Sequence, residues 1–129
     1  MIIIFALLSI QALMKSHISY MNLTNKNMQY YGSVSINSNN YSMLFDLQYQ
    51  DTWLPGVGCI NSHTTNLLTC TGSCTLGTTN LCEPDVYGKS ATTDITINDM
   101  KISSLVFSYA QEEELLNTGY LIPDGVMVN

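Results

Sequence analysis

Polar and apolar residues alternate along two neighbouring stretches of the chain, and this alternation predicts two paired strands. In "YYGSVSI" (30–36) every second residue lies on one face, with serines on the other. The Asn-rich segment "NSNN" follows, and "YSMLFDL" (41–47) then places Tyr41, Met43 and Phe45 on one face. A period of two residues is typical of a half-buried strand, and an Asn/Ser cluster between two such runs indicates a turn. We therefore expect a hairpin of the 30–36 and 41–47 strands.

The rest of the chain adds a long polar segment and a second alternating region. Residues 56–84 are rich in Gly, Ser, Thr, Asn and Cys and show little periodicity, which predicts a long loop held by disulfides. Alternation resumes at Asp94 and continues past an expected Asn98–Asp99 turn, and a third segment, 105–109, is expected to return to the sheet. The triple glutamate at 112–114, in a helix-like segment, predicts a solvated surface turn. The pattern as a whole predicts a mostly β chain.

Length and composition indicate at most one ordinary domain with a hydrophobic core. The chain has 129 residues, of which 46% are hydrophobic and 11% are charged. Four lysines, no arginine and ten acidic residues give a formal net charge of −6. Because nucleic acid is held largely by Lys and Arg at its phosphates, this charge argues against a nucleic-acid partner.

Residues 1–19 have the pattern of a secretory signal peptide. An apolar run extends from Ile2 to about Leu13 and is followed by Lys15. The run is too short to span a bilayer and has the length of a signal h-region, with cleavage after Ala12 or after Ser19 as the options. A membrane anchor, if the leader stays uncleaved, and a buried first strand are the alternatives. A signal peptide predicts a secreted protein, or one of the secretory and lysosomal or vacuolar compartments.

Four cysteines are consistent with an oxidising compartment and two disulfides. Three pairings are possible, and the short loops favour Cys59–Cys70 with Cys74–Cys82. A zinc site is disfavoured because the Cys-x3-Cys spacing is loose and His63 is the only imidazole nearby. We therefore expect no metal and no cofactor.

Two Asn-x-Ser/Thr sequons begin at Asn22 and Asn40. Such sequons accept glycans when a chain passes through the secretory pathway. Both asparagines are therefore predicted glycosylation sites, in agreement with the leader and the cysteines.

The segment "NLTNKNMQYYGSVSINSNNYSMLFDLQYQDTWLPGVGC" resembles the start of pepsin-like aspartic proteases (peptidase family A1). Members open with a polar segment, Tyr-Tyr/Phe-Gly and an alternating strand, followed by hydrophobic-Phe-Asp-Thr-Gly-Ser-Ser and hydrophobic-Trp-hydrophobic-Pro-Ser. Here Asp46 falls on the catalytic aspartate and Trp53 on the tryptophan seven residues later. Pro55 and Cys59 fall on the proline and the first half-cystine. The resemblance implies that Asp46 lies at a strand end because the family presents its carboxylate there.

The likeness continues through the rest of the sequence. "VYGKSATTDITINDMKISSLVFSYAQEE" looks like the family's flap and following strands, with Tyr87 on the flap tyrosine and Phe107 on a strand phenylalanine. "PDGVMVN" is similar to the family's Asp-Gly-Ile-Leu-Gly-Leu from Asp124 onward. Over residues 22–129 the resemblance implies an incomplete amino-terminal lobe of the pepsin-like fold, which is a closed or open β-barrel.

The resemblance also implies a cleft that binds a peptide or protein substrate. Tyr87 and Gly88 of the flap and Trp53 are its expected substrate-binding residues. The family match further implies that Trp53 and Tyr87 lie together at the cleft edge, with the indole N–H reaching the phenol oxygen.

The sequence departs from the family at the residues that carry the chemistry. Catalysis needs two carboxylates that share a proton, and two-lobed members take the second from a carboxy-terminal lobe. The 129 residues hold one of the pair, because Asp124 matches a structural position. Asp-Thr-Gly reads Asp46, Leu47 and Gln48, so the threonine hydroxyl and the torsional freedom of the glycine are lost. We expect an aspartic endopeptidase homologue that is inactive as this chain.

Other interpretations remain open. A homodimer would supply Asp46 twice, but Leu47 removes the hydroxyl contact between subunits. A non-catalytic secreted module that binds peptides or a protein is the main alternative, and a small disulfide-stabilised β domain without a cleft is another. Nucleophilic catalysis has no support, because His17 lies in the leader and His63 is expected to be an ordinary surface residue.

Overall fold

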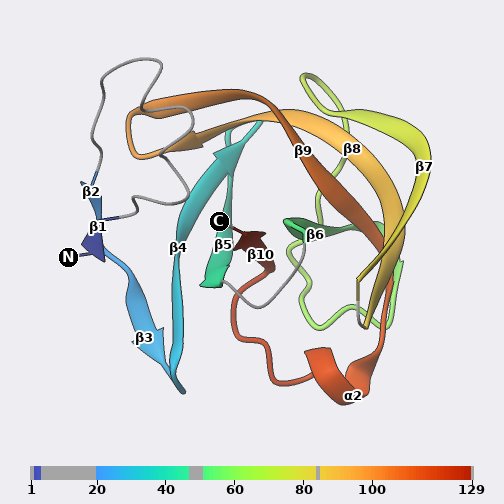
Figure 1. Cartoon of the computed structure of the whole chain (residues 1–129), viewed down its shortest axis with the longest axis horizontal. Coiled ribbons are helices and arrows are strands. Elements are labelled where there is room, and N and C mark those ends of the chain that lie inside the picture. Colours follow the sequence, from blue (N-terminus) through green and yellow to red (C-terminus); the bar gives the residue numbers. More distant parts are fainter. Residues whose placement is uncertain (1, 4–19, 47–50, 84, 129) are drawn as a thin grey trace.

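The computed structural model describes residues 2–3, 20–46, 51–83 and 85–128, and these residues form mainly β-strands (Figure 1). The strands are β1 (Ile2–Ile3), β2 (Tyr20–Met21), β3 (Thr24–Lys26), β4 (Gln29–Ile36), β5 (Asn39–Asp46), β6 (Trp53–Ile60), β7 (Thr75–Glu83), β8 (Val86–Ile97), β9 (Met100–Glu113) and β10 (Gly125–Val128). A short helix, α2 (Leu115–Thr118), follows β9. The prediction of a mostly β chain is confirmed. The described part of the chain has no helix with the length and apolar character needed to cross a membrane.

The first two strands form a small sheet of their own. Ile2 and Ile3 pair with Met21 and Tyr20 in antiparallel register. The predicted signal peptide falls mostly on residues 4–19, which lie outside the described residues.

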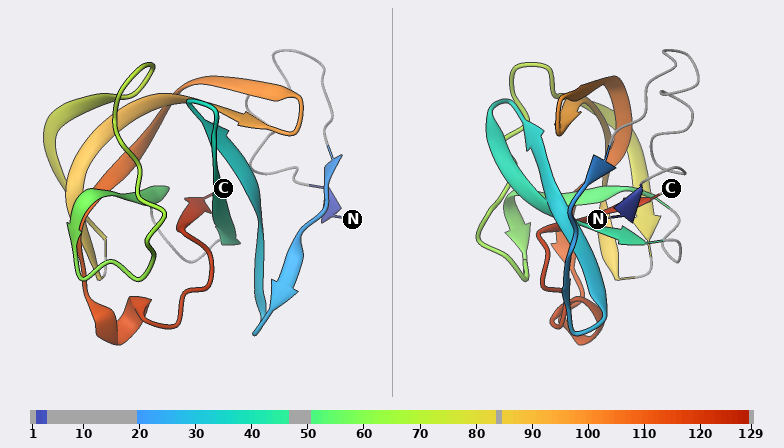
Figure 2. Two further views of the ribbon diagram at one scale, coloured as in Figure 1. Left: turned by 180° about the vertical axis from the view of Figure 1, so that it is seen from behind. Right: turned by 90° about the vertical axis from the view of Figure 1, so that its left-hand side faces the viewer.

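The other eight strands form one sheet in the order β3-β4-β5-β10-β6-β9-β8-β7. β4 also pairs with β8 through Ser35 and Thr96. The neighbouring strands β4, β5, β10, β6, β9 and β8 therefore close into a barrel. β8 and β9 arch over the ends of β4 and β5 and then descend on the other side (Figure 2). Within the described residues, β3 and β7 are the edge strands of this sheet.

The predicted hairpin is confirmed as β4 and β5. Val34 faces Tyr41 and Ile36 faces Asn39 in antiparallel register. The connecting residues Asn37 and Ser38 have φ of 50° and 68°. Two residues with positive φ make the tight turn whose twist matches that of the flanking strands, and Asn tolerates this conformation well.

The polar region 56–84 contains more strand than its composition predicts. β6 extends to Ile60 and β7 covers Thr75–Glu83. β7 lies at the edge of the sheet and nearly all of its described side chains are exposed, so it needs no apolar face and leaves no alternating pattern.

The second alternating region forms one long hairpin. The expected turn is confirmed: Asn98 has φ of 55° and joins β8 to β9. The third segment, 105–109, lies in the sheet as expected, and it is part of β9, which runs without a break from Met100 to Glu113. An irregularity in the β8–β9 register, near Thr93 and Ile95, lets this long pair bend as a bulge does.

Two buried clusters lie on opposite sides of the central strands. Met43 and Leu54 belong to the larger cluster, whereas their neighbours Leu44 and Trp53 belong to the smaller one. Successive side chains of a strand point to opposite faces, which explains this division. The larger cluster also contains Val34, Ile36, Tyr41, Leu68, Ile95, Ile97, Ile102, Phe107 and Met127.

Candidate functional site

Asp46 is the last residue of β5, as its position after an apolar strand predicts. Its backbone lies opposite Val128 of β10, and the two strands run parallel. The carboxyl ends of both strands therefore meet at one edge. Residues 47–50 lie outside the described residues, and so do the predicted effects of Leu47 and Gln48.

Thr52 holds this edge together and was missed by the sequence reasoning. The Val128 N–H donates to Thr52 Oγ1 over 3.0 Å, and the Ser108 N–H donates to the Thr52 carbonyl over 2.8 Å. Thr52 itself is buried. It links the start of β6 to the middle of β9 and to Val128 of β10, which is the residue paired with Asp46.

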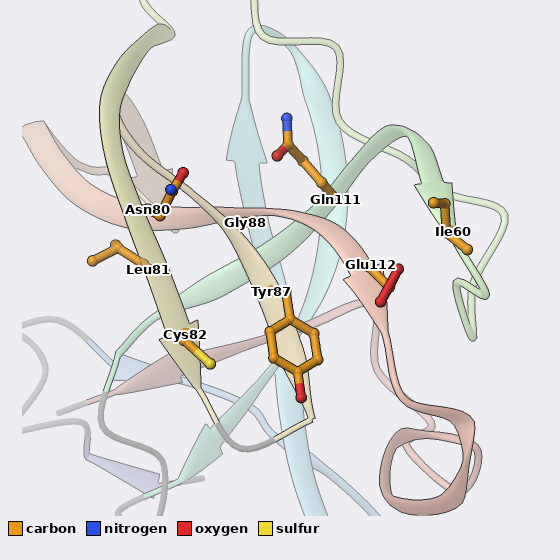
Figure 3. Close-up of a pocket in the computed structure, with 8 residues that line it drawn as sticks. All are labelled: Ile60, Asn80, Leu81, Cys82, Tyr87, Gly88, Gln111 and Glu112. Atoms are coloured by element: carbon orange, nitrogen blue, oxygen red, sulfur yellow. The ribbon is translucent and has the colours of Figure 1, made fainter.

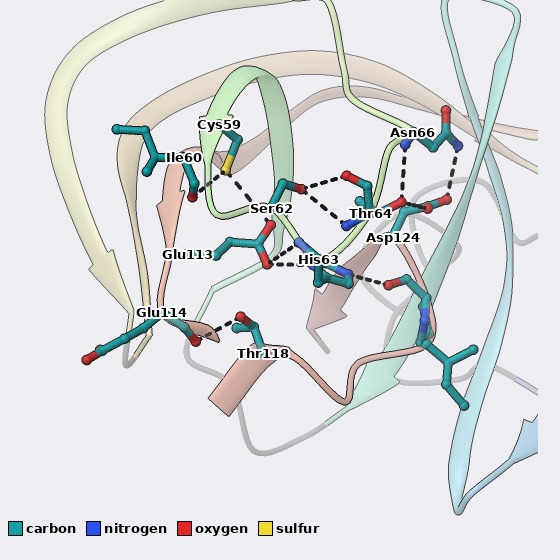
Figure 4. Close-up of polar contacts among 12 residues, drawn as sticks. Cys59, Ile60, Ser62, His63, Thr64, Asn66, Glu113, Glu114, Thr118 and Asp124 are labelled. Carbon is teal, nitrogen blue, oxygen red and sulfur yellow. Dashed lines mark hydrogen bonds and ion pairs between the residues drawn. The ribbon is translucent and has the colours of Figure 1, made fainter. Parts of the chain in front are cut away.

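Asp124 has a structural role, as the comparison with the family motif implies. The Ser42 N–H donates to Asp124 Oδ2 over 2.8 Å, and the Asp124 N–H donates back to the Ser42 carbonyl over 2.8 Å. Thr64 Oγ1 donates to Asp124 Oδ1 over 2.7 Å, and Asn66 Nδ2 donates to Oδ2 over 3.0 Å (Figure 4). The carboxylate thus joins the 64–66 loop to the start of β10 and to β5.

His63 and Glu113 form a buried pair that overturns two predictions. The His63 side chain is 2% exposed and that of Glu113 is 0% exposed, so neither is the surface residue expected from the sequence, whereas Glu112 and Glu114 are exposed as expected. His63 Nδ1 lies 2.5 Å from Glu113 Oε1, and Nε2 lies 2.6 Å from the Pro123 carbonyl oxygen. Glu113 is the last residue of β9 and does not lie in a solvated turn.

The geometry of this pair favours a charged imidazole. Both ring nitrogens of His63 face oxygen acceptors, and only the imidazolium donates from both. Burial lowers the pKa of His63, but the hydrogen bonds to Glu113 and to the Pro123 carbonyl outweigh this effect and raise the pKa above its usual value.

Cys59 lies on the other side of the Glu113 carboxylate. Its Sγ is 3.9 Å from Glu113 Oε2 and 3.8 Å from the Ile60 carbonyl oxygen. Burial and the neighbouring Glu113 raise the pKa of the Cys59 thiol to about 12. The carboxylate stands between thiol and imidazole, so this cluster is arranged to hold the fold together and not to generate a thiolate nucleophile.

Trp53 does not form the expected pair with Tyr87. Trp53 is 0% exposed and packs with Val86 in the smaller cluster, and its ring meets that of His63 edge-on at 5.9 Å between centroids. Tyr87 follows Val86 in β8, so it points to the opposite face, and it is 42% exposed. The β8 backbone separates the two side chains, and the predicted contact at a shared cleft edge is wrong.

Tyr87 and Gly88 instead line a pocket of about 360 Å³ (Figure 3). The pocket lies across β7, β8, β9 and the end of β6. Its other lining residues are Ile60, Asn80, Leu81, Cys82, Gln111 and Glu112.

The cysteines correct the expected disulfide pairing. Cys70 and Cys74 are bonded to each other across a tight turn, with their Cα atoms 4.9 Å apart. Cys59 and Cys82 keep their thiols. The predicted pairs are wrong because Cys59 belongs to β6, beside Glu113, whereas Cys82 lies on exposed β7.

Asn22 and Asn40 are both exposed, as an acceptor of a glycan must be. The Asn40 carbonyl accepts a hydrogen bond from Asn66 Nδ2 over 3.0 Å. Glycosylation at either site stays a prediction. Among the described residues, no three His, Cys, Asp or Glu side chains are grouped so as to hold a metal ion.

Neither the models of known protein families nor the curated proteins match the chain.

Proposed function

We propose that the chain is a secreted homologue of pepsin-like aspartic endopeptidases, with the amino-terminal-lobe pattern of peptidase family A1. Its site at Asp46 is degenerate, so a protein of these 129 residues does not cleave peptides. The observation that carries the proposal is the parallel pairing of β5 with β10, which brings the ends of "LFD" and "DGVMV" side by side.

The segments that carry the resemblance are neighbours in the sheet although they lie far apart in the sequence. Asp46 faces Val128, and Val126 of the same strand faces Trp53 at the start of β6. β10 thus lies between two strands that follow each other in the chain. This arrangement supports the proposal that the segments at Asp46, Trp53 and Asp124 belong to one site of the aspartic protease type.

The hairpin of β7 and β8 supports the flap interpretation in its backbone. Tyr87 is the second residue of β8, next to the turn that joins it to β7. Its side chain, however, faces away from Trp53, unlike the arrangement that the resemblance implies.

The absence of activity follows from the proton chemistry. A lone carboxylate cannot take a proton from water while it also donates one to the scissile carbonyl. Leu47 and Gln48 further replace the hydroxyl and the unhindered backbone that the family places beside the aspartate.

The test is a cleavage assay with internally quenched peptides at acid pH. The 129-residue chain, its Leu47→Thr/Gln48→Gly variant as a monomer, and Asp46→Asn should all be inactive. Cleavage by the unmodified chain that a statine-type transition-state analogue inhibits, and that Asp46→Asn abolishes, contradicts the proposal. That result would favour a symmetric dimer that supplies Asp46 twice.

The homology itself has a separate test in the transcript. A reading frame that continues past Asn129 to a second Asp-Thr/Ser-Gly motif supports it. In that longer protein, Leu47→Thr/Gln48→Gly should raise cleavage and Asp46→Asn should remove it. A longer frame in which Asp46→Asn leaves cleavage unchanged contradicts the role given to Asp46.

A non-catalytic module that binds a peptide or protein is the second candidate. The pocket that Tyr87 and Gly88 line favours it, because an aromatic ring beside a pocket suits the binding of a peptide side chain.

A further inference from the structure

A row of four side chains crosses the sheet at the pocket. Cys82 of β7 pairs with Tyr87 of β8, Tyr87 pairs with Glu112 of β9, and Glu112 pairs with Ile60 of β6. Directly opposed residues of neighbouring strands project to the same face. The row therefore forms one continuous surface, and Figure 3 shows the Tyr87 ring between Cys82 and Glu112.

This surface combines an aromatic ring, apolar area and negative charge. Tyr87 is 42% exposed and Ile60 is 56% exposed, and Glu112 is the one charged residue among the eight that line the pocket. The nearby Glu114 carboxylate, followed by desolvation and smaller effects of Cys82, Asp85 and Glu112, raises the pKa of the Tyr87 phenol. Acidic groups therefore surround the ring, and the described residues that line the pocket include no lysine.

The pocket also adjoins a strand edge. β7 is the last strand of the sheet in the described part of the chain, and residues 80–83 pair in regular register with 86–89 of β8. Alternate N–H and C=O groups on the outer side of an edge strand are available to an added strand. β7 carries no Lys or Pro, which commonly block such pairing.

We propose that an extended peptide pairs with the outer edge of β7 and places a Lys or Arg side chain in this pocket. The cation lies over the face of Tyr87 and near the Glu112 carboxylate, while its alkyl stem packs on the apolar lining. Backbone pairing supplies sequence-independent affinity, and the pocket selects the basic residue. The site does not depend on descent from a protease, and its test is independent of the cleavage assay.

The test uses two blocked hexapeptides, Thr-Val-Thr-Lys-Val-Thr and the same peptide with norleucine in place of lysine. Norleucine keeps the alkyl stem and removes the charge. In NMR titrations of the full chain at low salt, the lysine peptide should bind about three- to ten-fold more tightly. This advantage should shrink in high salt, and the shifted amide resonances should map to residues 80–83.

Variants of matched charge locate the effect. Glu112→Gln should bring the two peptides to within about two-fold of each other, whereas Asp99→Asn, in the distant β8–β9 turn, should leave the preference for lysine unchanged. Nα-acetyl-lysine amide tests for a small amine as the ligand and should bind far more weakly than the lysine peptide.

Three results overturn the proposal. The first is equal binding of the two peptides, or no shift with either one. The second is a lysine preference that survives Glu112→Gln. The third is binding of Nα-acetyl-lysine amide as tight as that of the lysine peptide, which would exclude strand pairing.

Discussion

At the scale of residues, Glu113 and His63 are the least expected feature of this protein. The carboxylate contacts the His63 ring, the His63 backbone N–H and the Cys59 thiol, and all three contacts are partly buried. Burying two opposite charges costs desolvation free energy, and this cost is offset only when the hydrogen bonds of both groups are satisfied. Here the Pro123 carbonyl satisfies the second ring nitrogen. The pair therefore joins the 61–64 loop, the end of β9 and the approach to β10.

Removing His63 should destabilise the protein strongly. His63→Gln leaves Glu113 buried without its cationic partner, and breaking a buried pair in this way costs about 3–5 kcal/mol. Urea unfolding of the variant and of the wild type measures the difference. A cost below about 1 kcal/mol would contradict a structural role for the pair.

The same pair predicts a pH dependence of stability. The pKa of His63 is raised in the folded state, so the folded protein holds the proton more tightly than the unfolded chain. Its contribution is fully present below the unfolded pKa of about 6.5 and is lost as the pH rises through the higher folded value. Glu113, Asp124 and the Cys59 thiol are the ionisable groups that bear on the ring or its partner.

The difference in unfolding free energy between wild type and His63→Gln should therefore decrease as the pH rises from acid to alkaline values. Glu113→Gln removes the charge that favours the imidazolium. The unfolding free energy of this variant should therefore vary less with pH than that of the wild type. Parallel pH profiles of the wild type and His63→Gln would contradict a charged His63.

At the scale of elements, the cysteines show how strand placement decides covalent structure. Cys70 and Cys74 lie at the two ends of a tight turn, and Cys74 is buried against the larger cluster. Cys59 and Cys82 belong to β6 and β7. A disulfide requires Cα atoms within about 7 Å, which the short turn provides directly.

Alkylation of the native protein should distinguish the two thiols. Cys82 is exposed and should react quickly, whereas Cys59 is partly buried and its pKa of about 12 leaves almost no thiolate. Mass spectrometry after native labelling should find one modified cysteine, and labelling in urea without reductant should find two. Peptides linked through Cys59–Cys70 or Cys74–Cys82 would restore the pairing expected from the sequence.

At the scale of the whole molecule, the larger buried cluster supports the barrel, including the sheet edge where β5 ends at Asp46. β9 contributes to it on one face and meets solvent on the other: Phe107 is 2% exposed and Val106 is 66% exposed. The interior also draws on β4, β5, β8 and β10, so its packing determines whether the sheet closes between β4 and β8.

Adjacent substitutions on β9 test this interior. Phe107→Ala leaves a large cavity among the barrel side chains and should cost about 3–5 kcal/mol. Val106→Ala removes an exposed side chain and should change stability by no more than about 0.5 kcal/mol. Equal costs in urea unfolding would contradict the assignment of the two faces.

The sequence by itself determined the local parts of this protein. Alternation and turn chemistry located the β4–β5 hairpin and the turn at Asn98, because both depend on residues that are close in the chain. An aspartate after an apolar run located Asp46 at a strand end. Only the tertiary structure decided that Glu113 is buried, since its partner His63 lies 50 residues away. It likewise decided that β10 inserts beside β5, that edge strand β7 forms without an apolar face, and that Val86 places Tyr87 away from Trp53. Such outcomes depend on which distant segments pack together, and a local pattern carries no information about that choice.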